Sequence, residues 1–106
     1  MRTGIGTQPS PTTTQKMRLT TKSRYGTRLL LDLAIHGGER PVPLGETARR
    51  QNISRKYLEQ LIRKLKQDGL VTSRRGPFGG HMLARPPEQI TIGDIVRTLE
   101  GTSALT

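Results

Sequence analysis

The strongest pattern of apolar and polar positions lies in the middle of the chain. Four apolar residues recur there at helical spacing: Leu58, Leu61, Ile62 and Leu65. At about 100° per residue they share one face, which predicts a helix over residues 54–68. Ser54 is suited to cap its start, and Gly69 can take the left-handed conformation that ends many helices. Leu70 is then placed to fold back on Leu65.

The opposite face of this helix is polar. It presents Lys56, Gln60, Arg63 and Gln67, with Glu59 at its edge. Such side chains can contact base edges and phosphates, but an ordinary amphipathic helix on a protein surface has the same pattern. The helix by itself leaves both interpretations open.

Two short apolar runs follow, Leu70 to Ser73 and Met82 to Ala84, separated by Arg, Gly and Pro residues. This spacing predicts a β-hairpin with arginines at its tip. A helix followed by a basic hairpin is typical of a winged helix-turn-helix. The predicted fold class is therefore mostly α with a small β-hairpin, arranged as a winged helix-turn-helix.

A first helix is predicted from Thr20 or Thr21 to about His36, where Gly37-Gly38 ends it. Apolar residues occupy more than one of its sides: Tyr25, Leu29, Leu30, Leu31, Leu33, Ala34 and Ile35. This is more apolar surface than one small core needs. We expect one face to pack against another chain or against a segment absent from this sequence.

Pro41-Val42-Pro43 fits a short extended piece, and a short helix over residues 44–51 would form the first half of the helix-turn-helix, closed by Asn52. Its burial relies on Leu44 and Ala48. Thr47 stands where a larger apolar residue would be expected, so the packing of this helix is expected to be weak.

A last helix is predicted to begin at Thr91, which makes a capping-box-like pair with Asp94, and to end at Gly101. Its apolar residues recur at helical spacing: Ile92, Ile95, Val96 and Leu99. Residues 1–16 are rich in Thr, Gly and Pro and are predicted to form a disordered tail. With a short tail at 102–106, one winged-helix domain remains over 17–101.

The net charge of +10 is unevenly distributed. Residues 44–85 carry ten basic and three acidic residues, whereas residues 86–106 carry one basic and three acidic residues. A localised basic surface indicates a polyanionic partner, and nucleic acid is favoured over a membrane because no basic amphipathic helix carries a bulky apolar face. A merely solvated basic face is the alternative.

Several kinds of chemistry are excluded or disfavoured. The chain has no cysteine, which excludes disulfides and thiolate metal sites. His36 and His81 lie on different elements without paired acids, so we predict no metal site, no cofactor and no catalytic residues. No signal peptide or membrane span is apparent, and the protein is expected to be cytoplasmic and not an enzyme.

Several motifs together resemble the IscR and NsrR type of bacterial transcriptional regulators. The resemblance covers about residues 17–101, in order and with few gaps. The motifs are MRLTTKSRYGTRLLLDLA at 17–34, PVPL at 41–44, ISRKYLEQL at 53–61, LKQDGLV at 65–71, RGPFGGH at 75–81 and ITIGDIVRTLEG at 90–101.

The resemblance implies a DNA-binding repressor or activator that is normally a dimer, with the helix over 54–68 in the major groove and the hairpin at 74–81 in the minor groove. Position by position it implies groove contacts by Lys56, Tyr57, Glu59 and Gln60, and wing contacts by Arg75, Gly76 and Pro77. The face count also selects Lys56 and Gln60, whereas Tyr57 falls nearer the core. Together with the basic first turn of the first helix, the predicted DNA-binding set is Lys22, Arg24, Tyr25, Ser54, Arg55, Lys56, Tyr57, Glu59, Gln60, Arg63, Arg74, Arg75, Gly76 and Pro77.

The sequence also departs from that family. Members with a sensor have three cysteines and a long dimerisation helix after the position of Gly101, and some use a carboxylate where this chain has Arg24. Phe78 replaces a glycine of the wing and His81 replaces the usual tyrosine, and either change can alter how the wing meets DNA. This chain is expected to lack the family's cluster.

Self-association is therefore expected to be weak. We predict a monomer or a weak homodimer, or a heterodimer with a related regulator, and the candidate contacts are Leu29, Leu31, Ile35, Ile95 and Leu99. Two functions remain open: a sequence-reading transcription regulator, and a winged-helix module that binds protein or RNA without operator specificity. Glu59 favours the first, because a carboxylate near phosphates is costly unless it accepts from a base.

Overall fold

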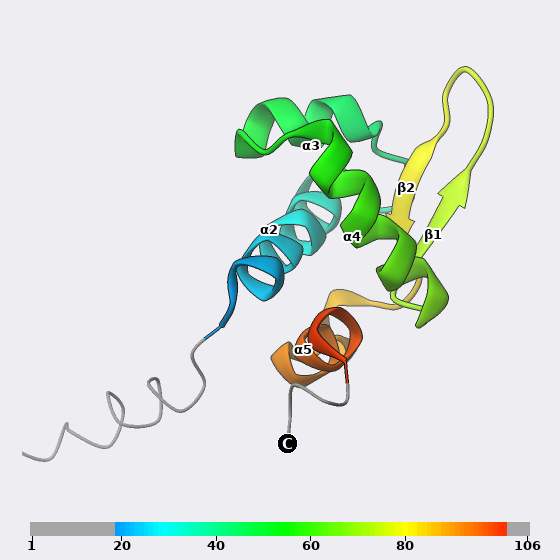
Figure 1. Cartoon of the computed structure of the whole chain (residues 1–106). Coiled ribbons are helices and arrows are strands. Elements are labelled where there is room, and N and C mark those ends of the chain that lie inside the picture. The colour runs from blue at the N-terminus through cyan, green and yellow to red at the C-terminus, as the bar shows by residue number, and fades with distance from the viewer. Residues whose placement is uncertain (1–18, 102–106) are drawn as a thin grey trace, which may run out of the picture.

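The computed structural model describes residues 19–101, so the predicted tails at 1–16 and 102–106 lie outside the described residues. Within that part of the chain the elements are α2 (Thr21–His36), α3 (Leu44–Gln51), α4 (Arg55–Gln67), β1 (Val71–Arg74), β2 (Gly80–Leu83), the 3-10 helix η2 (Pro87–Gln89) and α5 (Ile92–Glu100). Figure 1 shows α3 and α4 packed over α2, the hairpin on one flank and α5 at the other end. The predicted winged helix-turn-helix is confirmed.

Both predicted ends of α4 are confirmed. The Ser54 hydroxyl accepts a hydrogen bond from the Tyr57 amide at 3.0 Å. At the other end Gly69 has φ +77°, and the Leu70 amide donates to the Leu65 carbonyl at 2.9 Å. This is the Schellman arrangement, which returns the chain over the last turn of the helix. Local residues therefore fix where α4 starts, stops and reverses.

The apolar core is shared by the four α-helices of residues 19–101 and the base of the hairpin. Its buried members are Leu29, Leu30, Leu33, Val42, Leu44, Ile53, Leu58, Leu61, Ile62, Leu65, Leu70, Val71, Ile95 and Leu99. Helices α2 and α5 approach closely at Gly26, where an added Cβ would lie 2.2 Å from Cδ1 of Leu99. The core thus places one face of α4 against the body of the domain.

The core corrects part of the expected self-association surface. Leu29, Ile95 and Leu99 are buried in the fold and are unavailable to a second chain, so their prediction as dimer contacts is wrong. Leu31 and Ile35 do remain exposed, at 54% and 72%. Helical spacing alone did not distinguish the two faces of α2, because both are apolar.

A buried polar cluster joins α2 to α3 where an apolar contact was expected. Asp32 is 1% exposed, and its carboxylate accepts from the Thr47 hydroxyl at 2.7 Å. Arg50 donates to both carboxylate oxygens at 2.9 Å, and Gln51 donates at 3.0 Å. Burial alone would raise the pKa of Asp32, but the hydrogen bonds from Arg50, Thr47 and Gln51 outweigh it and lower the pKa to about 2. These polar contacts replace the large apolar residue that α3 lacks.

The hairpin is antiparallel, with Val71 opposite Leu83 and Arg74 opposite Gly80. Its second strand starts at Gly80, two residues before the predicted run, and ends at Leu83. Val42 forms a bridge to His81, donating to its carbonyl at 2.8 Å and accepting from its amide at 2.9 Å. The extended piece before α3 therefore anchors the hairpin to the body of the domain.

The last helix begins as predicted, after a short 3-10 turn that the sequence did not indicate. The Thr91 hydroxyl accepts from the Asp94 amide at 3.0 Å, and the Asp94 carboxylate accepts from the Thr91 amide at 3.0 Å. This reciprocal capping box fixes the start of α5. At its other end Glu100 accepts from the hydroxyls of Ser23 at 2.7 Å and of Thr20. The pair joins the end of α5 to the start of α2.

Candidate nucleic-acid interface

One face of α4 is polar and exposed, and we call it the reading face. Its members are Lys56, Glu59, Gln60 and Arg63, all of them exposed. The opposite face carries the buried residues Leu58, Leu61, Ile62 and Leu65. Because the core fixes the rotation of the helix about its axis, the reading face points away from the body of the domain. It presents donors and one carboxylate acceptor, the chemistry that base edges require.

The two tyrosines predicted to contact DNA pack against one another. The rings of Tyr25 on α2 and Tyr57 on α4 meet edge to face, with centroids 5.7 Å apart. Both are partly buried against the core. Burial raises the pKa of Tyr57 above its ordinary value, so its hydroxyl stays protonated well beyond neutral pH. Both rings therefore have a packing role in the fold and remain partly exposed.

Arg28 joins this tyrosine pair and was not anticipated from the sequence. Its guanidinium lies 5.4 Å from the centroid of the Tyr25 ring. It donates to the carbonyl and the side chain of Gln51 at 2.7 and 3.2 Å, at the end of α3. Tyr25 is its neighbour one turn away on α2, but Gln51 is 23 residues away, so no local pattern indicated the contact with α3. An exposed cation thus lies beside the turn between α3 and α4.

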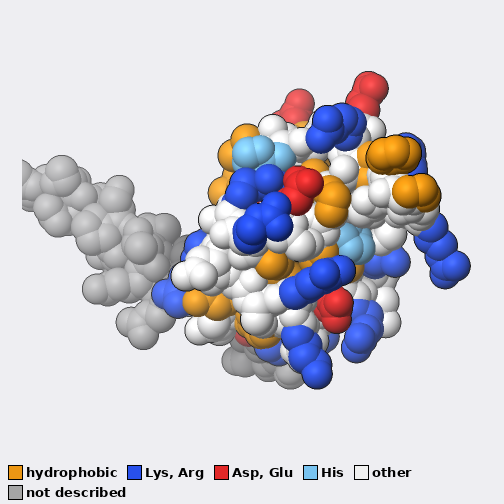
Figure 2. Space-filling view, turned by 90° about the horizontal axis from the view of Figure 1, so that it is seen from above, with side chains coloured by type: hydrophobic (Ala, Val, Ile, Leu, Met, Phe, Trp, Pro, Cys, Tyr) orange, Lys and Arg blue, Asp and Glu red, His pale blue; other side chains and the backbone are white. Residues whose placement is uncertain are grey.

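A groove of about 750 Å³ runs between α3, the start of α4 and the hairpin. Arginines from three elements line it, namely Arg49, Arg55, Arg74 and Arg75, and we call it the arginine groove. Glu46 and Glu59 also border it. Figure 2 shows Lys and Arg side chains spread over this face as seen from above, with acidic side chains between them. The structure brings the predicted Arg55, Arg74 and Arg75 together and adds Arg49, which the sequence pattern did not indicate.

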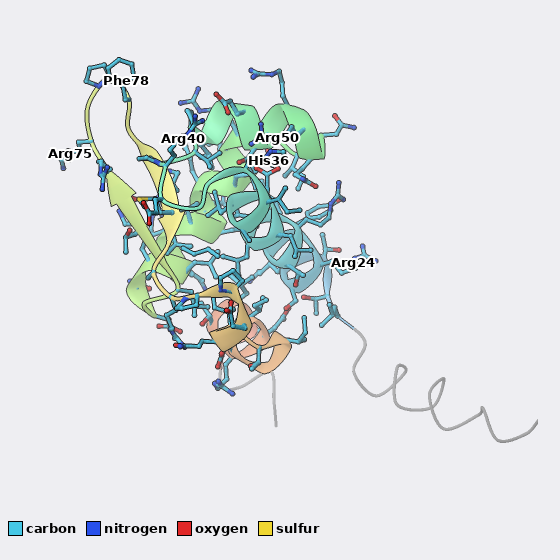
Figure 3. The ribbon with its side chains drawn as sticks, turned by 180° about the vertical axis from the view of Figure 1, so that it is seen from behind. Arg24, His36, Arg40, Arg50, Arg75 and Phe78 are labelled. Atoms are coloured by element: carbon cyan, nitrogen blue, oxygen red, sulfur yellow. The ribbon has the colours of Figure 1, made fainter. Side chains whose placement is uncertain are left out.

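We call residues 71–83 the wing, and its tip is a tight turn. The Gly79 amide donates to the Gly76 carbonyl at 2.9 Å, and Gly76 has φ +112°. Arg74, Arg75 and Pro77 are exposed. Figure 3 shows Arg75 and Phe78 at the end of the hairpin, away from the rest of the domain. The predicted wing residues therefore form one solvent-facing tip.

The basic start of α2 lies apart from this tip. Lys22 and Arg24 are exposed, and Figure 3 places Arg24 on the opposite side of the domain from Arg75. The structure does not bring them into the arginine groove. Any polyanion that contacts both Arg24 and Arg75 has to extend across the whole width of the domain.

His81 lies on β2, one pair from the turn of the wing, and faces Ser73 across the hairpin. Its Nδ1 is 2.9 Å from the Ser73 hydroxyl. Burial, and secondarily the charge of Lys66, lower the pKa of His81, which favours a neutral ring at pH 7. His81 therefore adds a hydrogen bond to the hairpin rather than a positive charge to the arginine groove.

Two negative findings apply to residues 19–101. Nowhere in this range do three His, Cys, Asp or Glu side chains gather in a way that suits a metal ion. None of the helices here is long and apolar enough to cross a membrane.

Comparison with known proteins identifies close relatives. The Rrf2 family, described as iron-dependent transcriptional regulators, matches residues 19–106. Protein rrf2 of Nitratidesulfovibrio vulgaris is 54% identical over 88 residues, which is 83% of this chain and 59% of that protein. The HTH-type transcriptional regulator CymR of Bacillus subtilis is 47% identical over 85 residues, which is 80% of this chain and 62% of that protein. The chain thus spans less than two thirds of the length of either relative.

Solved structures lead to the same proteins. The structure of CymR, the global cysteine regulator of B. subtilis, matches with a TM-score of 0.75 at 46% identity, covering 79% of this chain and 65% of that one. IscR of T. potens matches with a TM-score of 0.74 at 52% identity, covering 80% of this chain and 62% of that one. Sequence and fold therefore agree on one group of relatives.

Proposed function

Because the chain belongs to the Rrf2 family, we propose that it is a transcriptional regulator that binds double-stranded DNA in a sequence-specific manner. The observation that carries the proposal is the reading face of α4, fixed by the core and flanked by the arginine groove. We propose that residues 17–101 form the DNA-binding domain. The relatives named as HTH-type transcriptional regulators support this assignment.

The reading face would lie in the major groove, where each base pair presents a distinct set of donors and acceptors. Lys56 and Gln60 can donate to purine acceptors, and Glu59 can accept from the cytosine amino group. Glu59 borders the arginine groove, so its carboxylate would lie close to DNA phosphates. The resulting repulsion is costly unless a base donates a hydrogen bond to the carboxylate. A carboxylate at this position favours base reading over attraction by charge alone.

The arginine groove and the wing would contact the DNA backbone. Arg55 at the start of α4, together with Ser54 and the helix amides, is suited to a phosphate at the groove edge. Arg74, Arg75, Gly76 and Pro77 would lie along the adjacent minor groove, where the two arginines would contact the phosphates on either side. Lys22 and Arg24 would reach phosphates on the other flank. Arg63 extends the reading face toward the end of α4.

The alternative is a winged-helix module that binds protein or RNA. A module of this kind needs only a positively charged surface. General charge attraction gives no reason for a hydrogen-bond acceptor such as Glu59 to lie among the Lys and Arg side chains. The kinship with named transcriptional regulators and the position of Glu59 both favour the DNA-binding function over this alternative. RNA duplexes also present a deep, narrow major groove that the side chains of α4 would not reach.

The iron named in the family description does not fit the residues present. The 106 residues include no cysteine, and the described residues contain no cluster of three potential ligands. At the position where some relatives are expected to supply a carboxylate, the chain has Arg24. We therefore assign no role to iron in how residues 19–101 contact DNA.

Weak self-association is also part of the proposal. The exposed apolar side chains Leu31 and Ile92 border an apolar groove between α2, η2 and α5, which has a volume of about 130 Å³. Ile35 lies one turn along α2 from Leu31 and is 72% exposed. This small surface suits a dimer that dissociates at micromolar concentration. Sedimentation across a concentration series tests it: Leu31→Ser should abolish any dimer, and a wild-type dimer stable at nanomolar concentration would contradict it.

The direct test of the proposed function is selection of genomic DNA. The purified chain is mixed with fragmented genomic DNA at about 0.15 M salt, and the retained fragments are sequenced. We expect a single enriched motif, because base contacts discriminate sites beyond the general attraction of phosphates. Retention that depends only on fragment length would contradict sequence-specific binding. A parallel selection with single-stranded RNA identifies the alternative.

A further inference from the structure

Phe78 occupies a position that the core does not explain. It is 89% exposed, the most exposed large apolar side chain in the described part of the chain. Figure 3 shows it at the extreme end of the wing, where it points away from the domain. Phe78 therefore makes almost no contribution to folding, and a large apolar side chain is presented to solvent.

The turn fixes the direction of this side chain. Gly76 and Gly79 close it through a hydrogen bond of 2.9 Å, and Pro77 restricts the backbone just before Phe78. A Cβ at Gly79 would lie 2.2 Å from the Arg74 carbonyl oxygen, so the chain crosses itself closely at this point. The residue after Phe78 must therefore be glycine. The tip is therefore a short turn with a constrained backbone that carries one aromatic ring.

We propose that Phe78 is an apolar wedge that enters the minor groove of bound double-stranded DNA and partly unstacks one base step. This inference rests on the proposed function and deepens it, because it assigns the wing a role in choosing the DNA. Proteins that bind the minor groove commonly insert apolar side chains between base pairs, and the bent DNA then contacts more protein surface.

The charges around the ring favour DNA as its partner. Arg74 and Arg75 come immediately before the turn and are exposed. The described residues place no acidic side chain between Arg74 and Gly80. A protein surface that accepted Phe78 would also have to compensate for these two cations, whereas the phosphates on either side of a minor groove do so directly.

Insertion of Phe78 predicts that the protein prefers certain base steps at the insertion site. No hydrogen-bond donor or acceptor of the protein contacts the bases there. Pyrimidine–purine steps such as TA and CA unstack more easily than GC-rich steps. The wing should therefore favour an operator with a flexible step at the position of Phe78. Such a preference differs from base reading, because it follows the stiffness of the DNA and not its hydrogen-bonding groups.

The experiment uses the selected operator and the full chain. Permanganate oxidises thymines that have lost stacking, so it reports unstacking in bound DNA. The wild-type chain should make one thymine on the wing side reactive, and Phe78→Ala should remove that reactivity and weaken binding roughly tenfold. Phe78→Leu keeps an apolar wedge and should retain part of both effects. Because Phe78 is exposed, neither variant should change the thermal midpoint.

Two controls separate insertion of the ring from charge attraction and from base reading. Arg75→Ala should weaken binding, yet at saturating protein the same thymine should stay reactive, because the ring is still present. Replacing the contacted TA step by GC should weaken binding of the wild-type chain and leave binding of Phe78→Ala nearly unchanged.

The outcomes distinguish this inference from the proposed function. If no DNA sequence is enriched and no duplex is bound, the proposed function fails and the wedge fails with it. If an operator is bound but Phe78→Ala matches the wild type in affinity and in permanganate pattern, only the wedge is overturned. A variant that alters sedimentation but not DNA binding would assign Phe78 to a protein contact and also overturn it.

Discussion

Helix α4 and the wing face the same side of the proposed complex, yet they are supported in different ways. Four buried side chains and a cap at each end fix α4. In the wing only Val71 is fully buried among the eight strand residues, and the hairpin depends on its ladder and on the bridge to Val42. One region is mounted on the core, and the other extends from it.

This difference suits two kinds of DNA contact. Base reading requires donors and acceptors placed to within a fraction of an ångström, and such precision comes from side chains on a packed helix. Contacts to phosphates and groove walls tolerate small displacements, because charge attraction falls off slowly over a few ångströms. The fold thus assigns precision to α4, and charge and shape to the wing.

Removing the Asp32 carboxylate should have the largest effect of the changes considered, because it destabilises the packed helices that support α4 and not the wing. In Asp32→Ala the buried hydroxyl of Thr47 loses its acceptor, and the guanidinium of Arg50 loses one of its two carboxylate partners. Because Arg50 can still reach water, we expect the free energy of unfolding to fall by about 2–4 kcal/mol. Urea denaturation measures it, and the matched change Thr72→Ala on the exposed strand of the wing should cost less than about 0.5 kcal/mol.

Equal losses in the two variants would show that α3 is held to the body of the domain no more firmly than the wing. Urea denaturation repeated between pH 4 and pH 2 gives an independent test of the role of Asp32. The lowered pKa of Asp32, about 2, means that its stabilisation is complete above pH 4 and is lost as the pH falls from there toward 2. Asp32→Ala should be less sensitive to pH in that range.

Arg75→Ala tests the charge of the wing and should have a moderate effect on DNA affinity. Loss of one phosphate contact should reduce the slope of log K against log salt by about one unit and weaken binding to all sequences alike. Titrations at several salt concentrations measure the slope. A salt slope equal to that of the wild type would remove Arg75 from the interface, and Arg97→Ala on α5 is the matched control.

Acidification should have the smallest effect. Since burial lowers the pKa of His81, the unfolded chain binds a proton more readily than the folded one below about pH 6.5. Stability from this site is therefore complete above that pH and declines as the pH falls. His81→Tyr removes the titrating group, so the stability of the wild type relative to this variant should decline from pH 7 toward pH 5. A constant difference from pH 7 to pH 5 would contradict the assignment.

Most of the fold followed from local signals in the sequence. Ser54 and Gly69 bound α4 because capping depends on residues a few positions apart, and the same is true of Thr91 and Asp94. The 3-10 turn at Pro87–Gln89 was missed, because a single turn of three residues has no apolar period to reveal it. The faces of α2 were also missed, because apolar residues on several sides do not reveal which side the core will cover.

The polar contacts depended on long-range geometry and were less accessible. Asp32 meets partners 15 to 19 residues away, so the sequence showed only a charge that interrupts an apolar run. Arg49 and Arg28 joined the site for the same reason, because the packing of α3 on α2 and beside the wing decides where they point. The reading face itself was predictable from helical spacing, while its contacts with bases remain a prediction.

The central claim is that α4 reads bases and the wing does not, and Glu59→Ala tests it most directly. Affinities for the selected operator and for a scrambled duplex are measured in parallel for the wild type, Glu59→Ala and Arg75→Ala. Glu59→Ala should lose about 1–3 kcal/mol of discrimination at one base position, with little change on scrambled DNA. Arg75→Ala should weaken both duplexes equally. Equal weakening on the two duplexes by Glu59→Ala would contradict base reading by α4.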